Sequence, residues 1–539
     1  MHDIGSLVDQ LVESTRTSVG LFAPELVLSG TIVVMLLCRI LPLVWRVPTQ
    51  WIALAGAFTA FAWTLYQFDQ LVAPGGSFEA KSSFFTGLLK FDEFSTFFRM
   101  FLSLFLILTI TLTVLTGIPD REDAPDFYTL LIGATIGMMI MASANHLLMV
   151  FVGVEMTSVP SYAMVGFLKG RRQSSEAALK YVVYGAGAAG VMLYGISLLA
   201  GLTGTGSLPD MAERLSMIVA QGKGISDPTN RTIVLASLMV LVGLAFKLSV
   251  FPFHFWCPDA FEGAAAEVAG FLSVASKAGA FALLVRFGLA FSGHSKEVSS
   301  IAFALGIGLG VLGAATATFG NLSAYGQSNM KRLLAYSTIA HAGYMLMSVS
   351  ALLVLRFSKH AGTEAEAASL SCIEGLMYYL FVYLFMNLGA FAIVALIRNQ
   401  IFSEELDDYN GLGTQCPVLC FGMTICVFSL IGLPPMGGFF AKFAIFYSVF
   451  KATSVHWVMW FVLGAGAINT VFSLFYYIRI LKAMYVKPRP DGARKVNYDL
   501  MPVGVFVLMI CLPVLGLGLF PSEFTKTFND IAKVLLTRN

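Results

Sequence analysis

The chain has 539 residues, of which 57% are hydrophobic and only 12% are charged, and its mean hydropathy is +0.78. This composition excludes an ordinary soluble globular domain and is typical of an integral membrane protein. The formal net charge of +2 is too small, and the basic residues are too scattered, to indicate nucleic-acid binding.

The apolar runs predict the secondary structure. Stretches of about 20 predominantly apolar residues, long enough to cross roughly 30 Å of hydrocarbon, recur with short polar connections between them. We therefore expect an all-α polytopic membrane protein with about fourteen transmembrane helices. The polar stretch before Glu25 lacks the order of a cleavable signal peptide. The predicted spans cover residues 24–45, 51–72, 94–117, 127–143, 146–168, 180–203, 231–250, 264–290, 298–320, 330–354, 373–398, 416–448, 455–484 and 499–520.

Two of these spans contain prolines near a lysine, and they suggest a repeated organisation. Pro252 follows Lys247, and Pro434 precedes Lys442. Irregular backbone at membrane depth is tolerated only beside protein or a water-filled cavity. Interrupted helices in corresponding positions of two halves indicate an internally repeated transporter. We expect an N-terminal three-helix segment at residues 1–125, five-helix repeats at 126–290 and 298–485, and a C-terminal helix with a tail at 499–539.

The distribution of basic residues predicts the orientation in the membrane. An even number of spans places both termini on one side, and a modest excess of Lys and Arg follows the odd-numbered spans. By the positive-inside rule, both termini are expected on the non-cytoplasmic side. The basic residues in these connections are Arg46, Arg121, Lys169, Arg171, Arg172, Lys331, Arg332, Arg398, Lys487, Arg489, Arg494 and Lys495. Those expected to act as headgroup-level anchors are Arg171, Arg172, Lys331 and Arg332.

The seven cysteines give no indication of a metal site. They stand singly in or beside apolar runs, without the CxxC pairs that hold zinc or an iron–sulfur cluster. Cys416 and Cys420 would share a helix face, but two thiols favour packing over metal binding. We therefore expect no metal or cofactor in this chain.

Four charges inside predicted spans are the main candidates for function, namely Glu155, Lys247, Lys277 and Lys442. A charged side chain near the middle of a span costs about 2.5–3.5 kcal/mol on insertion scales, so it usually faces a partner or water. Burial disfavours the charged form of lysine, whereas a nearby carboxylate favours it. Moving the carboxylate would therefore load or unload a proton. Static ion pairing, or a neutral Glu155 bonded to a neighbouring helix, remains the alternative.

Three further residues are candidates for a secondary relay. His341 lies inside the tenth predicted span and His254 lies just past the first break, and histidine titrates near physiological pH. A buried, hydrogen-bonded imidazole is the alternative for each. Lys180 follows Glu176 by four residues, which also fits an ordinary helix-surface pair, so its role at the edge of a pathway stays open.

Six stretches of the sequence carry a family resemblance: Gly153–Tyr162, Glu176–Tyr181, Phe246–Asp259, Phe271–Lys277, Asn329–Tyr344 and Gly432–Phe443. Together they resemble the antiporter-like subunits of proton-pumping NADH:quinone oxidoreductase, respiratory complex I, over about residues 90 to 485. Gly153 and the run from Glu176 to Tyr181 favour the N-type among these subunits. One departure is that Ala265 and Glu267 stand where the family usually has two prolines, which leaves the shape of that loop open.

The resemblance implies two inverted five-helix repeats, with Glu155, Lys247, Lys277 and Lys442 as a central charged axis. It implies that protons are the transported ion and that flavin, iron–sulfur clusters and quinone belong to partner subunits. The expected partners are other membrane subunits of complex I and the lipid bilayer. We expect the chain to lie in a bacterial inner membrane.

Three functions compete at this point. The first is a proton-translocating subunit of complex I, in which redox energy released elsewhere shifts the pair of Glu155 and Lys247. The second is a subunit of a multi-subunit sodium/proton antiporter, although sodium prefers clustered oxygen ligands and the central spans offer lysines. The third is a passive membrane spacer, which needs neither buried titratable groups nor paired helix breaks.

Overall fold

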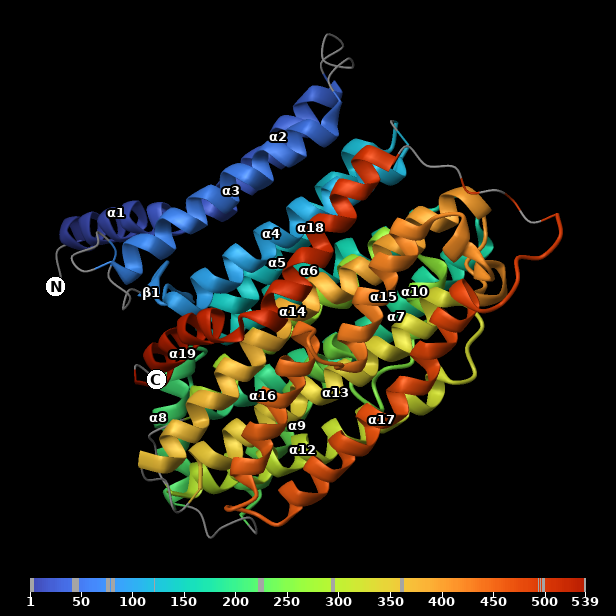
Figure 1. Cartoon of the computed structure of the whole chain (residues 1–539). Coiled ribbons are helices and arrows are strands. Elements are labelled where there is room, and N and C mark those ends of the chain that lie inside the picture. Colours follow the sequence, from blue (N-terminus) through green and yellow to red (C-terminus); the bar gives the residue numbers. More distant parts are fainter. Residues whose placement is uncertain are drawn as a thin grey trace.

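The computed structural model describes residues 4–40, 48–73, 78, 83–120, 122–221, 227–291, 296–358, 363–492, 494, 496 and 500–537. Long helices dominate these residues, and most of them run side by side in one bundle (Figure 1). The strands form one short antiparallel hairpin of β1 (Ser83–Phe84) and β2 (Leu89–Lys90), with Phe84 opposite Leu89. Three basic residues used for the orientation, Arg46, Arg121 and Lys495, lie outside the described residues.

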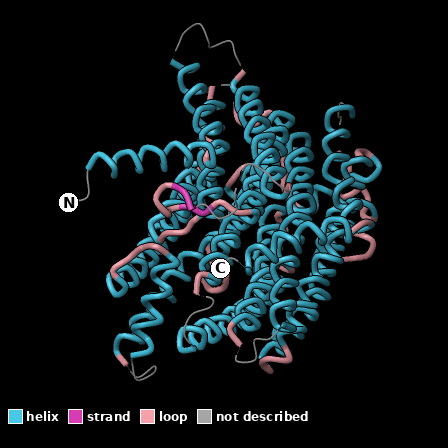
Figure 2. The backbone as a smooth tube through the Cα atoms, turned by 90° about the vertical axis from the view of Figure 1, so that its left-hand side faces the viewer, coloured by secondary structure: helices cyan, strands magenta, loops and turns pink. Residues whose placement is uncertain are grey.

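The N-terminal segment contains the three predicted spans and one further helix. The helices are α1 (Ile4–Leu21), α2 (Ala23–Ile40), α3 (Thr49–Val72) and α4 (Glu93–Thr116). The polar stretch that precedes the spans forms α1, which runs across the direction of the bundle helices (Figure 2). At the start of α4, the Asp92 carboxylate accepts from the Ser95 backbone N–H, and the Ser95 hydroxyl accepts from the Asp92 N–H. This capping box fixes where α4 begins.

Two groups of five helices follow in the same order, and the fourth helix of each group is broken. Because each group has an odd number of helices, the second begins at the opposite side of the bundle from the first, which gives inverted orientations. The first group is α5 (Ala124–Ser143), α6 (Leu147–Val165), α7 (Arg172–Thr203), the broken pair α9 (Pro228–Leu248) and α10 (Trp256–Gly263), and α11 (Ala266–Leu289). The second group is α12 (Lys296–Ala324), α13 (Met330–Arg356), α14 (Thr363–Ile401), the broken pair α15 (Pro417–Ile431) and α16 (Gly437–Ala452), and α17 (Val458–Tyr485).

The remaining elements lie in connections and at the C-terminal end. The helix α8 (Leu208–Gln221) lies between α7 and α9, and the short 3₁₀ helices η2 (Leu406–Tyr409) and η3 (Leu412–Thr414) precede α15. After α18 (Leu500–Leu519), the predicted tail forms a second helix, α19 (Pro521–Thr537). The apolar face of α19 buries Phe528, Ile531 and Leu535, and its Phe528 ring packs against the rings of Phe97 and Phe381.

The structure agrees with the expected number of about fourteen spans to within one or two. Among the described residues, twelve helices are long and apolar enough to cross a membrane, or thirteen if the bent pair Leu406–Thr414 and Pro417–Ile431 counts as one span. The predicted span 51–72 is a helix, α3, although it is not among the twelve. The predicted span 416–448 is divided into α15 and α16, and each piece is too short to be counted alone.

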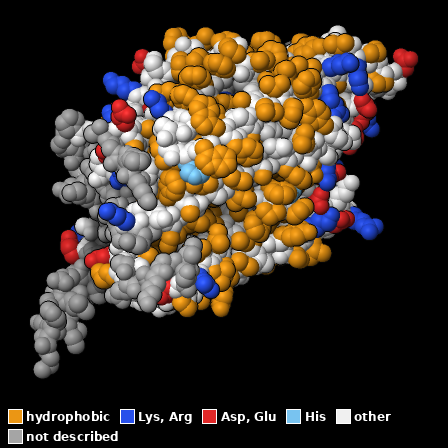
Figure 3. Space-filling model, turned by 90° about the horizontal axis from the view of Figure 1, so that it is seen from below, with side chains coloured by type: hydrophobic (Ala, Val, Ile, Leu, Met, Phe, Trp, Pro, Cys, Tyr) orange, Lys and Arg blue, Asp and Glu red, His pale blue; other side chains and the backbone are white. Residues whose placement is uncertain are grey.

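The helices form a buried centre and a lipid-facing shell. In the most apolar stretch of α11 and of α13, all residues are buried, and in that of α14, 94% are buried. In the most apolar stretches of α2 and α17, only 28% are buried. One face of the molecule accordingly shows a broad band of hydrophobic side chains, with most charged side chains gathered toward its two ends (Figure 3). This distribution matches a bundle whose middle lies in hydrocarbon.

The loop that lacks the family prolines is short and regular. The helix α10 ends at Gly263, and α11 begins at Ala266 after a link of Ala264 and Ala265. Ala265 has φ −61° and ψ 147°. A proline ring fixes φ near −65°, so alanine here keeps the backbone conformation that proline would impose. Ala265 therefore has a backbone conformation that a proline could also adopt.

Candidate functional site

The first break leaves the end of α9 inside the bundle, where a lysine of another helix covers it. Ser249 has φ 58°, in the left-handed region, and it ends α9. The Lys277 Nζ of α11 donates to the Leu248 carbonyl at 2.8 Å and to the Ser249 Oγ at 3.1 Å. The last carbonyls of a helix lack intrahelical partners and carry the negative end of the helix dipole, which favours a cation. The charged form of Lys277 is thus held by the broken helix.

The second break has the same chemistry. Gly432 ends α15 with φ +89°, and a Cβ added there would lie 3.0 Å from the Lys442 Cδ. The Lys442 Nζ of α16 donates to the carbonyls of Leu430 and Ile431, each at 2.9 Å. It also lies 4.9 Å from the centroid of the Tyr344 ring, a cation–π contact. At each break, a buried lysine therefore donates to the last carbonyls of the first helix half. The sequence patterns alone did not predict these contacts.

Lys247 and Glu155 lie near each other, but they form no direct ion pair. The buried Lys247 Nζ donates to the Ser158 Oγ at 3.0 Å, and Ser158 lies one turn after Glu155 on α6. The charges of Glu155 and Lys247 interact electrostatically, while Glu155 itself is only half-buried in this chain. The Lys247 ammonium is therefore held by the Ser158 hydroxyl, which itself donates to the Val154 carbonyl. Glu155 acts on Lys247 only through its charge.

His341 lies at the centre of a network of hydroxyl groups. Its Nδ1 is 2.6 Å from the Tyr379 hydroxyl and its Nε2 is 3.2 Å from the Tyr477 hydroxyl, which in turn lies 2.5 Å from the Ser337 Oγ. All four side chains are buried. The network brings together α13, α14 and α17 beside Tyr344, whose ring faces Lys442. Hydroxyl and imidazole groups both donate and accept, so this arrangement can pass a proton.

His254 lies in a different environment, among aromatic rings. Its ring centroid is 4.2 Å from that of Phe319, 4.4 Å from that of Phe255 and 5.5 Å from that of Phe251. Its buried Nδ1 has no hydrogen-bond partner in the described part of the chain. Among the described residues His254 makes no hydrogen bond to Lys247 or Lys277, so a relay through it stays a prediction.

Lys180 belongs to a charged cluster at one end of the bundle. Its Nζ lies 2.9 Å from Glu176 and 2.8 Å from Asp259 of α10, and Arg332 bridges Asp259 and Glu262 at 2.7 and 2.6 Å. These residues line a cavity of about 240 Å³ between α7, α10 and α13. The pair with Glu176 is the expected helix-surface contact within α7. The contact with Asp259 joins α7 to α10.

Lys331 was expected at the headgroup level and is instead buried. Its side chain is 1% exposed, its Nζ donates to the Ala264 carbonyl at 2.5 Å, and it pairs with Glu404 at 3.0 Å. The buried Glu267 interacts with it electrostatically. The prediction was wrong because α10, α11 and the residues after α14 close over the start of α13. Arg171 and Arg172 are exposed, as a headgroup anchor requires.

Two fully buried ion pairs were missed by the sequence reasoning. Arg99 donates to Glu25 at 2.6 Å, and Arg286 donates to both Asp92 oxygens at 2.9 and 2.8 Å. Arg99 lies in the predicted span 94–117 and Arg286 in the span 264–290, so the criterion that selected the lysines would have found them. A guanidinium effectively never releases its proton, and these pairs therefore hold helices together rather than carry protons.

The described residues contain no group of three His, Cys, Asp or Glu side chains that could hold a metal ion. Cys416 Sγ and Cys420 Sγ lie 3.9 Å apart, both in the buried core. The chemistry that the site offers is thus acid–base chemistry on lysine, glutamate, histidine and tyrosine. The fold and this site define a polytopic membrane protein of the transporter type, built on two inverted units with broken helices.

Comparison with known proteins gives the family. A family described as NADH:quinone oxidoreductase/Mrp antiporter, transmembrane, matches residues 144–473. The NADH-quinone oxidoreductase subunit N of Anaeromyxobacter sp. (strain Fw109-5) is 39% identical over 526 residues, which cover 93% of this chain and 94% of the relative. The NADH-quinone oxidoreductase subunit N 2 of Chloroherpeton thalassium is 34% identical over 538 residues, which cover 98% and 97%.

A solved structure agrees with these relatives. A chain in the structure of respiratory complex I from Thermus thermophilus with bound aureothin is similar with a TM-score of 0.71 at 29% identity, and the match covers 93% of this chain and 98% of that one. This chain therefore belongs to the NADH-quinone oxidoreductase subunit N family, within the wider group of complex I and Mrp antiporter membrane subunits.

Proposed function

We propose that this chain is the N-type membrane subunit of a bacterial NADH:quinone oxidoreductase, and that it translocates protons along Glu155, Lys247, Lys277, His341 and Lys442. The observation that carries the proposal is the position of Lys277 and Lys442, each of which donates to the open carbonyl end of a broken helix. The carbonyl end of a broken helix stabilises the charged ammonium form of the lysine that contacts it. If the helix end moves away from the lysine, that stabilisation is lost and the lysine can release its proton.

The first half of the proposed path begins at the half-buried Glu155. A change in the neighbouring subunit would move the Glu155 carboxylate relative to Lys247, whose ammonium is hydrogen-bonded only to the Ser158 hydroxyl among the described residues. Taking away the carboxylate disfavours the charged form of Lys247, so the proton leaves toward Lys277. Redox energy released elsewhere in the complex would drive this shift.

The second half runs through the hydroxyl network around His341. Protons would pass from Lys277 by way of water to His341, and from there to Lys442 beside Tyr344. Lys180 would serve at the edge of the path, at the cavity that it shares with Asp259 and Arg332. Flavin, iron–sulfur clusters and quinone are expected in partner subunits, because this chain supplies acid–base groups.

We place the chain in a bacterial inner membrane with both termini on the non-cytoplasmic side. The exposed Lys169 and Arg171, which precede α7, and Arg172, its first residue, support this orientation through the positive-inside rule. Residue-specific labelling of single cysteines introduced before α7 and after α19 in sealed membrane vesicles would test it. Both sites labelled from the same side would contradict the orientation.

Purification of the chain from native membranes, followed by mass spectrometry of its partners, tests the proposed function. We expect subunits that carry flavin and iron–sulfur clusters, and NADH oxidation only when these subunits are present. NADH oxidation by the chain alone would refute the proposal. Recovery of antiporter subunits without redox partners would favour a sodium/proton antiporter instead, although the buried amines of Lys277 and Lys442 do not suit sodium, which prefers oxygen ligands.

A further inference from the structure

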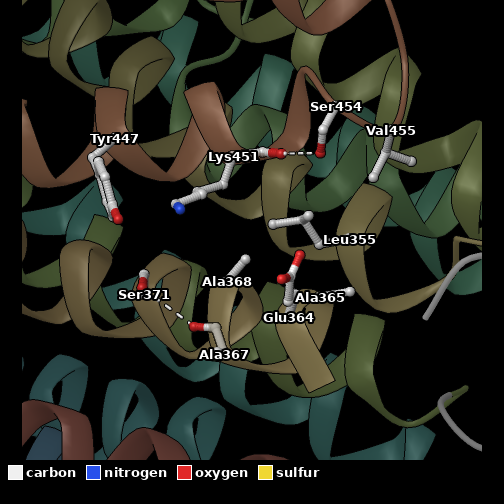
Figure 4. A pocket seen from close by; sticks show the side chains of 10 residues that line it. All are labelled: Leu355, Glu364, Ala365, Ala367, Ala368, Ser371, Tyr447, Lys451, Ser454 and Val455. Atoms are coloured by element: carbon white, nitrogen blue, oxygen red, sulfur yellow. Dashed lines mark hydrogen bonds between the residues drawn. The ribbon is translucent and has the colours of Figure 1, made fainter. Parts of the chain in front are cut away.

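A cavity that no residue of the proposed proton path lines opens between α14 and α16. It has a volume of about 550 Å³, within the range of small-ligand pockets, and its lining includes Glu364, Ser371, Tyr447 and Lys451. Figure 4 shows Tyr447 and Lys451 on one side of the cavity, with Glu364 and Ser371 on the other. The first turns of α14 and the last turns of α16 supply these two sides.

The two charged groups of the cavity face it without neutralising each other. Lys451 Nζ lies over the Tyr447 ring, 5.2 Å from its centroid, and within the described residues neither Lys451 nor Glu364 takes part in an ion pair. The cavity therefore presents one cation and one anion on opposite walls. A ligand with one negative and one positive group would satisfy both.

The cavity lies at the level of the membrane–water interface. The helix α13 ends at Arg356, α14 begins at Thr363, and α16 and α17 are joined by a short turn after Ala452. Trp457 is 73% exposed and Trp460 is 56% exposed at the start of α17. Exposed tryptophans mark the headgroup layer of a bilayer. A phosphate or amine of a lipid headgroup would thus stand at the right depth to enter the cavity.

An apolar track leads from the cavity toward the middle of the membrane. Phe439, Phe443 and Tyr447 follow one another at four-residue intervals along α16, with successive ring centroids 6.4 Å apart and the rings nearly parallel. Phe443 is 60% exposed. Because residues four apart lie on one face of a helix, these rings form a continuous strip that ends at the cavity. Such a strip suits an acyl chain.

We propose that this cavity binds the headgroup of a zwitterionic phospholipid, phosphatidylethanolamine, with the phosphate on Lys451, the ammonium on Glu364 and an acyl chain along Phe443. The ammonium of ethanolamine has N–H donors for the Glu364 carboxylate, whereas choline has none. A phosphatidylglycerol headgroup carries only negative charge, which Glu364 repels. The order of affinity is therefore phosphatidylethanolamine, then phosphatidylcholine, then phosphatidylglycerol.

The test uses the intact complex, purified with a mild detergent and exchanged into deuterated lipids. Native mass spectrometry counts the lipid retained on this subunit, and a photoreactive phosphatidylethanolamine maps the contact to peptides of α14 and α16. Lys451→Ala and Glu364→Gln should each lower the retained phosphatidylethanolamine by about threefold to fivefold, as expected for one partly exposed ion pair. Both residues are exposed, so assembly should be unchanged.

The matched control is Lys296→Ala, which removes an exposed lysine at the same end of the bundle outside the cavity and should leave retention at the parent level. Equal retention of phosphatidylglycerol, or no effect of Lys451→Ala and Glu364→Gln, overturns the proposal. Displacement of the lipid by inorganic phosphate would also overturn it, because the site would then bind a soluble anion. A neighbouring subunit found cross-linked in the cavity would do the same.

Discussion

At the scale of single residues, the contrast between lysine and arginine decides which buried charges can carry protons. Lys247, Lys277 and Lys442 are buried and are hydrogen-bonded to neutral hydroxyl or carbonyl groups. Arg99 and Arg286 are equally buried but are paired with carboxylates. An ammonium without a fixed counter-ion can release its proton, whereas a paired guanidinium cannot. In the proposed function, the buried lysines are therefore the mobile charges and the paired arginines the structural ones.

Replacement of Lys247 by Arg or by Ala tests whether this residue carries protons or is only a fixed structural charge. A proton carrier predicts that both variants assemble and that proton pumping falls by about tenfold or more in each, because arginine keeps the charge but not the proton exchange. Quinone-coupled turnover and proton uptake into membrane vesicles measure the effect. As a control, Lys296→Arg changes an exposed lysine and should pump at the parent rate. A Lys247→Arg complex that also pumps at the parent rate would exclude the carrier role.

Glu155→Gln keeps the shape of the side chain and removes its charge. We expect normal assembly with pumping reduced by about tenfold or more, because Lys247 then loses the carboxylate that favours its charged form. The same pumping assay measures this. Glu213→Gln, an exposed glutamate of α8, is the matched control and should change nothing. If Glu155→Gln pumps normally, the residue is structural.

At the scale of elements, the broken helices are the features that bring backbone carbonyls to the lysines. The chain can end α15 in the middle of the bundle because Gly432 adopts φ +89°, a conformation that side chains other than glycine rarely take. Ser249 fulfils the same role after α9. In both breaks the exposed carbonyls would be costly in hydrocarbon, and the lysine contacts remove that cost.

Gly432→Ala should disturb the second break directly. The left-handed conformation costs a side chain roughly 1–2 kcal/mol, and the added Cβ would press on the Lys442 Cδ. We expect a lower thermal stability of the complex together with reduced pumping. Gly464→Ala is the matched control, because that helical glycine of α17 has no atom within 4 Å of an added Cβ. Equal effects of the two substitutions would contradict the role given to Gly432.

At the scale of the whole molecule, a buried ion pair joins the N-terminal segment to the first five-helix unit. Arg286 of α11 donates to Asp92 at the start of α4 and to the Ala142 carbonyl of α5. Asp92 also caps α4 through Ser95. Arg286 therefore ties α11 to two helices, α4 and α5, that lie far from it in the sequence.

Arg286→Ala should destabilise the fold strongly, since it leaves the Asp92 carboxylate buried without its partner. Breaking such a pair costs about 3–5 kcal/mol. The amount of assembled subunit in the membrane and its thermal unfolding measure the effect. Arg39→Ala removes the exposed partner of Asp126 and should cost about 1 kcal/mol or less. Similar losses for both variants would show that the buried pair contributes little.

The sequence by itself determined the class of the protein, the positions of the spans and the two breaks. Hydropathy, proline and charge are local properties, so they identify the helices and mark Lys247, Lys277 and Lys442 as buried. Glu155 was also found in this way, because its surroundings along the chain are apolar. The prolines also predicted the break within the span 416–448.

Only the tertiary structure decided what these residues touch. The hydrogen bonds from Lys277 to Leu248, from Lys442 to Leu430 and from Lys247 to Ser158 join different helices or the two halves of a broken one. The burial of Lys331 depends on elements that close over it from elsewhere in the chain. Such contacts depend on how the helices pack, and no periodicity within one helix encodes the partner it will meet on another.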